Sequence, residues 1–246
     1  MDAATDVSNH IDGSTMPTWC TQQSPPPGVA AADSTCLDFG DGQLPSNGGW
    51  TVMTANQGTA APTMQRASSL PYSLQTSVST GDGSDAALVW HDAGAQPIAS
   101  VTVAVDLSPA GQGVATPWTG SVSLLCVDLG SGHACLSYTV GVDTSFATAY
   151  TGYYLTMEYD GGGVTFNEYQ LYGTLQANIW TRVQMQITAS SELIQITIPD
   201  TTNAPITGHF DPDTAVDVTV GPETGGATSG WSGYLDNIVV DVARAN

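Results

Sequence analysis

The stretches 180-WTRVQMQIT-188 and 193-LIQITIP-199 decide the fold, because apolar and polar residues alternate along both of them. In the first stretch Val183, Met185 and Ile187 fall on one side, and polar residues fall on the other. A period of two is typical of a β-strand with one buried face and one exposed face. Since only a short segment separates them, the two stretches predict an antiparallel hairpin with one face toward the core.

Similar alternating runs recur at intervals of about ten residues, the spacing typical of a β-sandwich. Clusters rich in Gly, Asp, Ser and Pro separate these runs and predict tight turns, and no segment predicts a helix. The sequence therefore predicts an all-β protein, a two-sheet antiparallel jelly-roll sandwich. The remaining predicted strands are 50–54, 72–78, 87–92, 98–107, 121–129, 135–142, 153–160, 164–173, 216–220 and 234–242.

Charge limits the partners of this chain. Its 246 residues include 23 acidic residues and three cationic ones, all arginines, for a net charge of −20. Phosphate binding needs clustered lysine and arginine, so nucleic acid is excluded as a natural partner. The same balance argues against docking on an anionic membrane surface, and it favours divalent cations.

Two regions are predicted along the chain. Residues 1–35 are acidic and proline-rich and lack apolar periodicity, so we expect an N-terminal tether, with the sandwich domain over 36–246. No apolar run is long enough to span a membrane. We expect an export signal to have been removed, which makes the protein secreted or displayed at a cell surface, with a lipid anchor at the removed N-terminus left open.

The four cysteines predict two disulfides and an oxidising compartment. Cys126 and Cys135 end two strand-like runs, so a bridge across the neck of that hairpin is expected. Cys20 and Cys36 flank a proline-rich stretch, and their bridge would tie the tether to the first strand. Neither pair has zinc-finger spacing.

Three segments, 36–52, 178–188 and 216–242, carry a family resemblance. They read CLDFGDGQLPSNGGWTV, NIWTRVQMQIT and VDVTVGPETGGATSGWSGYLDNIVVDV. Together they resemble the concanavalin A-like lectin/glucanase and laminin-G-like domains of secreted bacterial surface proteins. The first and last segments also resemble carbohydrate-binding modules of the galactose-binding jelly-roll type. That superfamily includes lectins, glucanases, lyases and adhesion modules, so the resemblance implies a fold and leaves the function open.

The resemblance also implies a structural calcium ion, held between the first strand and the acid of the closing strand. Carried over to this chain, Asp41 and Asp236 are the side-chain ligands. The family's usual glutamate after phenylalanine is Gly40 here, which weakens the match. The alternatives are an Asx-turn at Asp41 and a carboxylate that binds turn amides at Asp236.

A sugar-binding surface needs aromatic platforms beside polar side chains. Alternation puts Tyr154 and Glu158 on the polar side of one strand, where they could join Gln184 and Gln186 on an exposed sheet face. Trp90 lies near a strand end and is a further candidate. For each exposed candidate the alternative is packing under a loop.

Catalysis has a weaker basis in the sequence. Glucanases of the resembling fold use E-x-D-x-x-E, whereas this chain has Glu158 and Asp160 followed by glycines, without the third acid. We therefore assign no catalytic residue and expect a non-catalytic extracellular recognition or adhesion domain that binds carbohydrate or another cell-surface ligand. A self-associating structural surface protein and a polysaccharide-degrading hydrolase or lyase are the alternatives.

Overall fold

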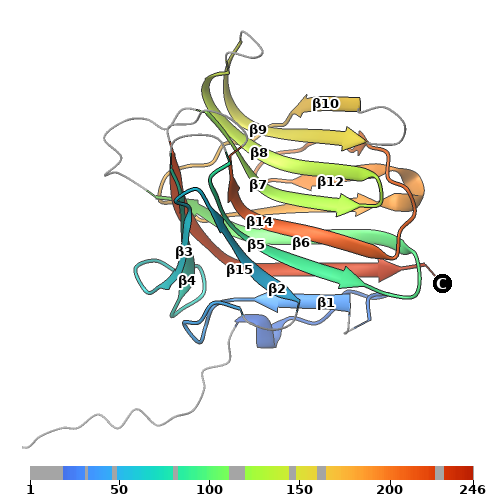
Figure 1. Ribbon diagram of the computed structural model, residues 1–246, viewed down its shortest axis with the longest axis horizontal. Coiled ribbons are helices and arrows are strands. Elements are labelled where there is room, and N and C mark those ends of the chain that lie inside the picture. The colour runs from blue at the N-terminus through green and yellow to red at the C-terminus, as the bar shows by residue number, and fades with distance from the viewer. Residues whose placement is uncertain are drawn as a thin grey trace, which may run out of the picture.

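The computed structural model describes residues 19–30, 33–45, 49–79, 83–110, 120–143, 148–159, 165–224 and 230–245. Within these ranges the chain forms two antiparallel sheets, here called sheet A and sheet B, which lie face to face (Figure 1). Short 3-10 turns at Trp19–Gln22 and Ala189–Ser191 are the helical elements of the described part. The predicted all-β, two-sheet sandwich is confirmed.

Sheet A has eight strands, ordered β13-β12-β11-β6-β15-β4-β3 with β1 also paired to β15. The predicted hairpin lies at one side of it, where Met185 pairs with Ile196 and Ile187 with Ile194. Its strands are β1 (Ser34–Leu37), β3 (Thr59–Thr63), β4 (Ser73–Val78), β6 (Ile98–Pro109), β11 (Thr181–Thr188), β12 (Leu193–Thr197), β13 (Ile206–Thr207) and β15 (Trp231–Arg244).

Sheet B has seven strands, ordered β10-β9-β8-β7-β14-β5-β2. Along β9, Tyr153, Leu155 and Met157 point into the core, so their neighbours point to the outer face of the sheet. Its strands are β2 (Trp50–Ala55), β5 (Asp85–Ala93), β7 (Gly120–Leu129), β8 (Gly132–Asp143), β9 (Thr148–Tyr159), β10 (Thr165–Gln170) and β14 (Ala215–Glu223).

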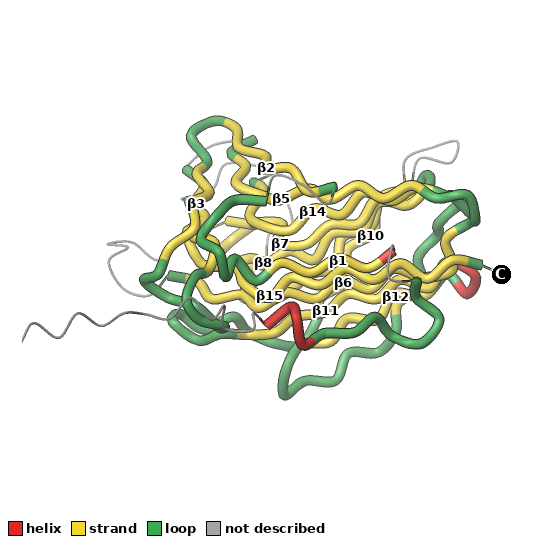
Figure 2. The backbone as a smooth tube through the Cα atoms, turned by 90° about the horizontal axis from the view of Figure 1, so that it is seen from below, coloured by secondary structure: helices red, strands yellow, loops and turns green. Residues whose placement is uncertain are grey.

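Both predicted disulfides are present: Cys20–Cys36 and Cys126–Cys135. The first ties the 3-10 turn of Trp19–Gln22 to β1, which begins at Ser34 and pairs with β15. Figure 2 shows this turn beside β15 and β11. The Trp19 ring lies 5.1 Å from the guanidinium carbon of Arg182 on β11. This cation–π contact holds the turn against sheet A in addition to the disulfide. Residues 1–18 of the predicted tether lie outside the described ranges.

The two-residue strand β13 and strand β3 were not predicted. The sequence of β3, Thr59–Thr63, contains two alanines and Pro62 and has no large apolar residue to mark a buried face. Proline is tolerated here because β3 is the edge strand of sheet A. In the described ranges no helix is long and apolar enough to cross a membrane.

A buried bulge in β15 organises one end of sheet A. The pairing of β15 with β6 shifts register between Asp236 and Val239, and Asn237 has a positive φ of 50°. The fully buried Asp236 carboxylate accepts hydrogen bonds from the backbone amides of Ser68 and Ser69, at 2.9 and 2.8 Å, and from that of Asn237. These bonds fix the segment before β4 against the bulge.

A second carboxylate completes this network. Asp106 on β6 accepts hydrogen bonds from Arg182 at 3.0 Å, from the Asn237 amide at 2.7 Å and from the Ser68 hydroxyl at 2.8 Å. Arg182 also donates to the Asn237 carbonyl. The Leu-Asp-Asn-Ile sequence of the closing strand is thus a structural lock that joins β6, β11, β15 and the segment before β4.

Asp236 makes stability depend on pH. Burial raises the pKa of Asp236 to about 7 from 3.8, although the amide hydrogen bonds oppose the shift. Between these values the folded state holds a proton that the unfolded chain has released, so the free energy of unfolding falls as pH rises from about 4 to about 7. A shift of this size corresponds to at most about 4 kcal/mol.

Denaturant unfolding of Asp236→Asn and the wild type across this pH range measures the effect. The variant is less stable at low pH, because it loses part of the amide binding, but its stability falls less steeply with pH. Parallel curves for the two proteins would contradict the assignment.

Candidate functional site

The outer face of sheet B arranges side chains from five adjacent strands into three rows, two of them polar and one built around a disulfide. The first, here called the His133 row, contains His91 on β5, Asp217 on β14, Asp128 on β7, His133 on β8 and Glu158 on β9, each paired in register with the next. Register pairs point to the same face, so these side chains form a continuous line. The row spans the strands that lie at the centre of Figure 1.

The His133 row contains two histidine–carboxylate pairs. The Nδ1 atom of His91 lies 2.7 Å from Asp217, and that of His133 lies 2.5 Å from Asp128. The hydrogen bond with Asp128 raises the pKa of His133 above its ordinary value, while burial opposes the shift. The contact with Asp128 therefore holds the His133 ring in a fixed orientation on this face and favours its protonated form.

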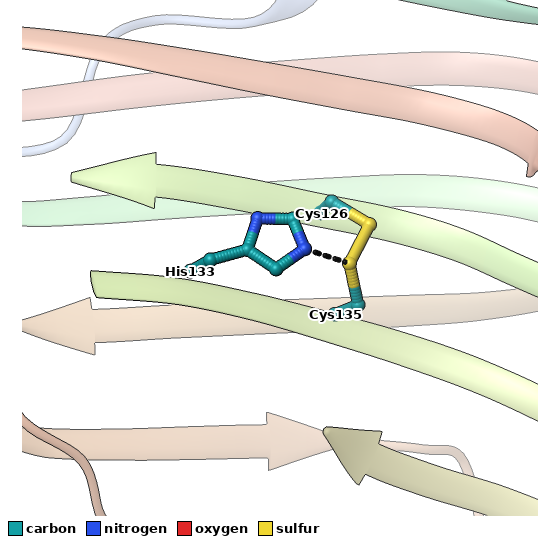
Figure 3. Close-up of side chains that lie close together, drawn as sticks. All are labelled: Cys126, His133 and Cys135. Atoms are coloured by element: carbon teal, nitrogen blue, oxygen red, sulfur yellow. Dashed lines mark hydrogen bonds between the residues drawn. A yellow bond between two sulfur atoms is a disulfide. The ribbon is translucent and has the colours of Figure 1, made fainter. Parts of the chain in front are cut away.

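The second row, the disulfide row, lies one pleat further along. Cys126 pairs with Cys135 across β7 and β8, flanked by Thr219 on β14 and Thr156 on β9. The two cysteines are 2% and 4% exposed, so the bridge forms a floor under the polar side chains. Figure 3 shows the His133 ring against this bridge, with Nε2 3.0 Å from the Cys135 sulfur.

The third row, the Glu223 row, contains Asp85 on β5, Glu223 on β14, Ser123 on β7, Ser137 on β8 and Tyr154 on β9. A bulge before Glu223 interrupts the β14–β7 pairing. The Glu223 carboxylate reaches back to the disulfide row, with Oε2 3.8 Å from the Cys126 sulfur. Burial raises the pKa of Glu223 to about 7, and the nearby Asp85 carboxylate adds to the shift.

A cavity of about 300 Å3 opens at the end of the His133 row. His133 and Glu158 form one side, and the segment before β14 forms the other with His209. There the Nδ1 atom of His209 lies 2.5 Å from Glu192, and its ring meets Tyr159 edge-on at 4.3 Å between centroids. Two imidazoles, two carboxylates, an amide and two aromatic rings thus surround a space of ligand size.

The predicted ligand set is not brought together. Gln184 and Gln186 do lie on an outer face, but on that of sheet A, where they line a groove of about 630 Å3 with Thr102 and Asp241. Glu158 is on sheet B. The sandwich separates the two faces, since packed sheets are about 10 Å apart. The prediction of one shared surface is therefore wrong.

Two aromatic candidates are buried. Trp90 lies on the inner face of β5, 4% exposed, with its ring centroid 6.3 Å from that of Trp50. Tyr154 lies on the outer face as predicted, but it is only 3% exposed beside Ser137. Neither offers an open stacking platform, so both predictions are corrected. Asp160 of the predicted acid pair lies outside the described residues.

The arrangement does not fit a calcium ion held by Asp236. Backbone N–H groups surround that carboxylate, and a cation would have to displace them. Asp41 forms an Asx-turn, accepting a hydrogen bond from the Gln43 amide at 3.0 Å. These contacts match the alternatives considered for both residues, and calcium stays an untested prediction.

Sequence patterns missed the residues that define this face. Asp85 and Glu223 lie within clusters typical of turns, STGDGSD and GPETGG. The predicted strands 121–129 and 135–142 left His133 in the turn between them, but it lies in β8, two residues before Cys135. The spacing His-x-Cys was the available signal, because alternate residues of a strand share a face.

No protein-family model and no curated protein sequence matches this chain. Solved structures do. An endo-β-1,4-glucuronan lyase from the fungus Trichoderma reesei has a TM-score of 0.62 at 13% identity, covering 84% of this chain and 94% of that one. The chain has a concanavalin A-like jelly-roll fold.

Two glucanases share this fold. A Bacteroides ovatus GH16 protein of a mixed-linkage-glucan locus, solved with a product, has a TM-score of 0.55 at 9% identity, covering 85% of this chain and 99% of that one. The catalytic domain of a Thermotoga petrophila laminarinase has a TM-score of 0.51 at 12% identity, covering 86% of this chain and 97% of that one. At these identities the likeness establishes the concanavalin A-like architecture and leaves the chemistry to the side chains of this chain.

The electrostatics of the face can be tested through Glu223. Removing the Asp85 charge (Asp85→Asn) lowers the pKa of Glu223, because a like charge no longer opposes ionisation. Replacing His133 by Gln raises the pKa of Glu223, because the charge interaction with His133, which lowers that pKa, is lost. Carbon-13 NMR titration of the side-chain carboxyls measures both. Shifts in the same direction would show that the two groups do not act on Glu223 as described.

Proposed function

We propose that this protein binds a polysaccharide along the outer face of sheet B, outside the cell. The observation that carries the proposal is the pair of polar rows on either side of the buried disulfide row, with the cavity beside Glu158 and His209 at one end. Hydroxyls of a sugar chain need such closely spaced carboxylates, imidazoles and amides. Solved structures with the same fold include a glucuronan lyase and glucanases, which supports a glycan as the ligand.

The charge of the face defines the class of glycan. The chain has no lysine, and its three arginines bind partners away from this face: Arg66 with Asn178, Arg182 with Asp106, and Arg244 with Asp33 and Asp92. A polyuronate would therefore meet carboxylates without a lysine or arginine to neutralise it.

The expected ligand is accordingly a neutral or amine-bearing polysaccharide. Asp85, Asp128, Glu158, Asp217 and Glu223 all lie on the rows of this face. Their carboxylates accept hydrogen bonds from sugar hydroxyls and attract protonated amines. Secretion fits the same proposal, since the two disulfides are typical of an oxidising compartment.

Hydrolysis is a second candidate, favoured by one observation. Asp85 and Glu223 are direct partners on adjacent strands, so two carboxyl groups lie side by side on the proposed glycan face. Glycosidases need two carboxyl groups flanking the scissile bond. Release of reducing sugar that is lost in Glu223→Gln, with glycan binding retained, would establish this activity.

Binding to a polysaccharide panel tests the proposed ligand class. The panel includes neutral β-glucans, chitosan, alginate and glucuronan, each assayed in low and moderate salt. We expect retention on neutral or amine-bearing glycans and none on the polyuronates. Preferential binding to alginate or glucuronan would overturn the assignment of ligand class.

Variants on each sheet test whether the outer face of sheet B is the glycan-binding surface. A bulky side chain in the disulfide row (Thr156→Trp) and loss of the imidazole (His133→Ala) each weaken binding by about tenfold or more, since each removes or blocks a central contact. The matched control is Gln184→Ala with Gln186→Ala, on the outer face of sheet A. A larger loss in this control than in the sheet B variants would contradict the proposal.

A further inference from the structure

The β7–β8 hairpin places three metal-ligating side chains on one face. His133 and Cys135 are alternate residues of β8, and Cys126 is the direct partner of Cys135 on β7. The two sulfurs and an imidazole nitrogen all lie within 4.8 Å of one another. Figure 3 shows the imidazole beside both sulfurs. In the oxidised protein the S–S bond leaves neither sulfur as a thiolate, so this arrangement holds no metal in that state.

We propose that reduction of the Cys126–Cys135 disulfide converts this group into a site for zinc or a similar divalent ion, with Cys126, Cys135 and His133 as ligands. A dithiol supplies two electrons: the S–S bond breaks, both sulfurs become thiols, and the dithiol closes to its own disulfide. On binding, the two thiols release two protons to the buffer, and the metal keeps its charge.

The orientation of His133 is already that of a metal ligand. Asp128 takes the Nδ1–H hydrogen bond at 2.5 Å, which leaves Nε2 facing the sulfurs. A carboxylate behind a histidine fixes its tautomer and strengthens it as a ligand in zinc sites. The pair therefore forms a carboxylate–histidine arrangement aimed at the place where a metal would lie.

A fourth ligand lies next to the sulfurs. The Oε2 atom of Glu223 is 3.8 Å from the Cys126 sulfur, and carboxylate oxygen is an accepted zinc ligand. Two Zn–S bonds of about 2.3 Å at a tetrahedral angle require sulfurs about 3.8 Å apart. Breaking the S–S bond frees both sulfurs to move apart, by rotation about their Cα–Cβ bonds, toward this separation.

Burial suits the ligand set. Cys126 and Cys135 are 2% and 4% exposed, whereas the His133 side chain is 41% exposed. The thiolates are therefore shielded from water, and an ion would enter on the histidine side. The inference is independent of the glycan proposal, because it rests on the ligand atoms alone.

Cobalt titration tests the site. The double variant Cys20→Ser/Cys36→Ser, which retains only the hairpin cysteines, is reduced with dithiothreitol, freed of it without oxygen, and titrated with Co2+. We expect one equivalent to bind, with thiolate-to-cobalt charge-transfer absorption and the visible bands of a tetrahedral ion. The same protein in its oxidised state shows neither. Absence of charge transfer in the reduced protein would overturn the proposal.

Further variants separate ligation from accidental thiol binding. Asp128→Asn is expected to weaken zinc binding about 10–100-fold, the usual effect of losing a partner of a ligating histidine, and His133→Ala weakens it at least as much. The matched control is Cys126→Ser/Cys135→Ser, reduced in the same way. It keeps the thiols of Cys20 and Cys36, and we expect it to show no thiolate-to-cobalt charge transfer. Circular dichroism confirms that each variant is folded. Unchanged affinity in His133→Ala would also overturn the proposal.

Discussion

The inward packing of alternate side chains in sheet B is the constraint on which the rest of the structure depends. Tyr153, Leu155 and Met157 of β9 are buried against the core. The residues between them in the sequence therefore point to the outer face of the sheet. The same alternation in β7, β8 and β14 lines up Asp128, His133 and the cysteines on that outer face. The candidate site is thus the direct consequence of the core, and a shift of one residue in any of these pairings would dismantle both.

Local patterns predicted most of the strands and both disulfides. The alternation in β11 and β12 predicts their pairing and their buried faces. Both strands and the short turn between them lie in one short stretch of sequence, so no distant segment is needed for the prediction. The Cys126–Cys135 bridge follows from a hairpin in the same way. Strand β3 was missed because Pro62 and two alanines give no alternation, and its pairing with β4 is visible only in the structure.

The site could not be assembled from sequence, because it depends on which distant strands are neighbours. Gln184 and Glu158 each lie on the polar side of an alternating strand. Their strands belong to different sheets, and the connections that cross between the sheets decide this. Glu223 meets Cys126 only because β14 pairs with β7 nearly a hundred residues away in the chain. Trp90 turned inward, since an indole buries more apolar area than its strand neighbours.

The two sheets hold their charged groups in different settings. Arg182, Asp106 and Asp236 lock sheet A around the bulge in β15, whereas the carboxylates of sheet B lie on an open face. This division accounts for an acidic surface that no arginine neutralises. On the proposed glycan face, no arginine or lysine is therefore present to neutralise a polyuronate.

The most direct test of the account is NMR mapping of backbone amides during titration with an oligosaccharide from the best-binding neutral or amine-bearing glycan. We predict that the shifted amides cluster on β7, β8, β9 and β14 and around the cavity beside His209. A cluster on β6 and β11, along the groove of sheet A, would contradict the claim that the outer face of sheet B is the binding surface.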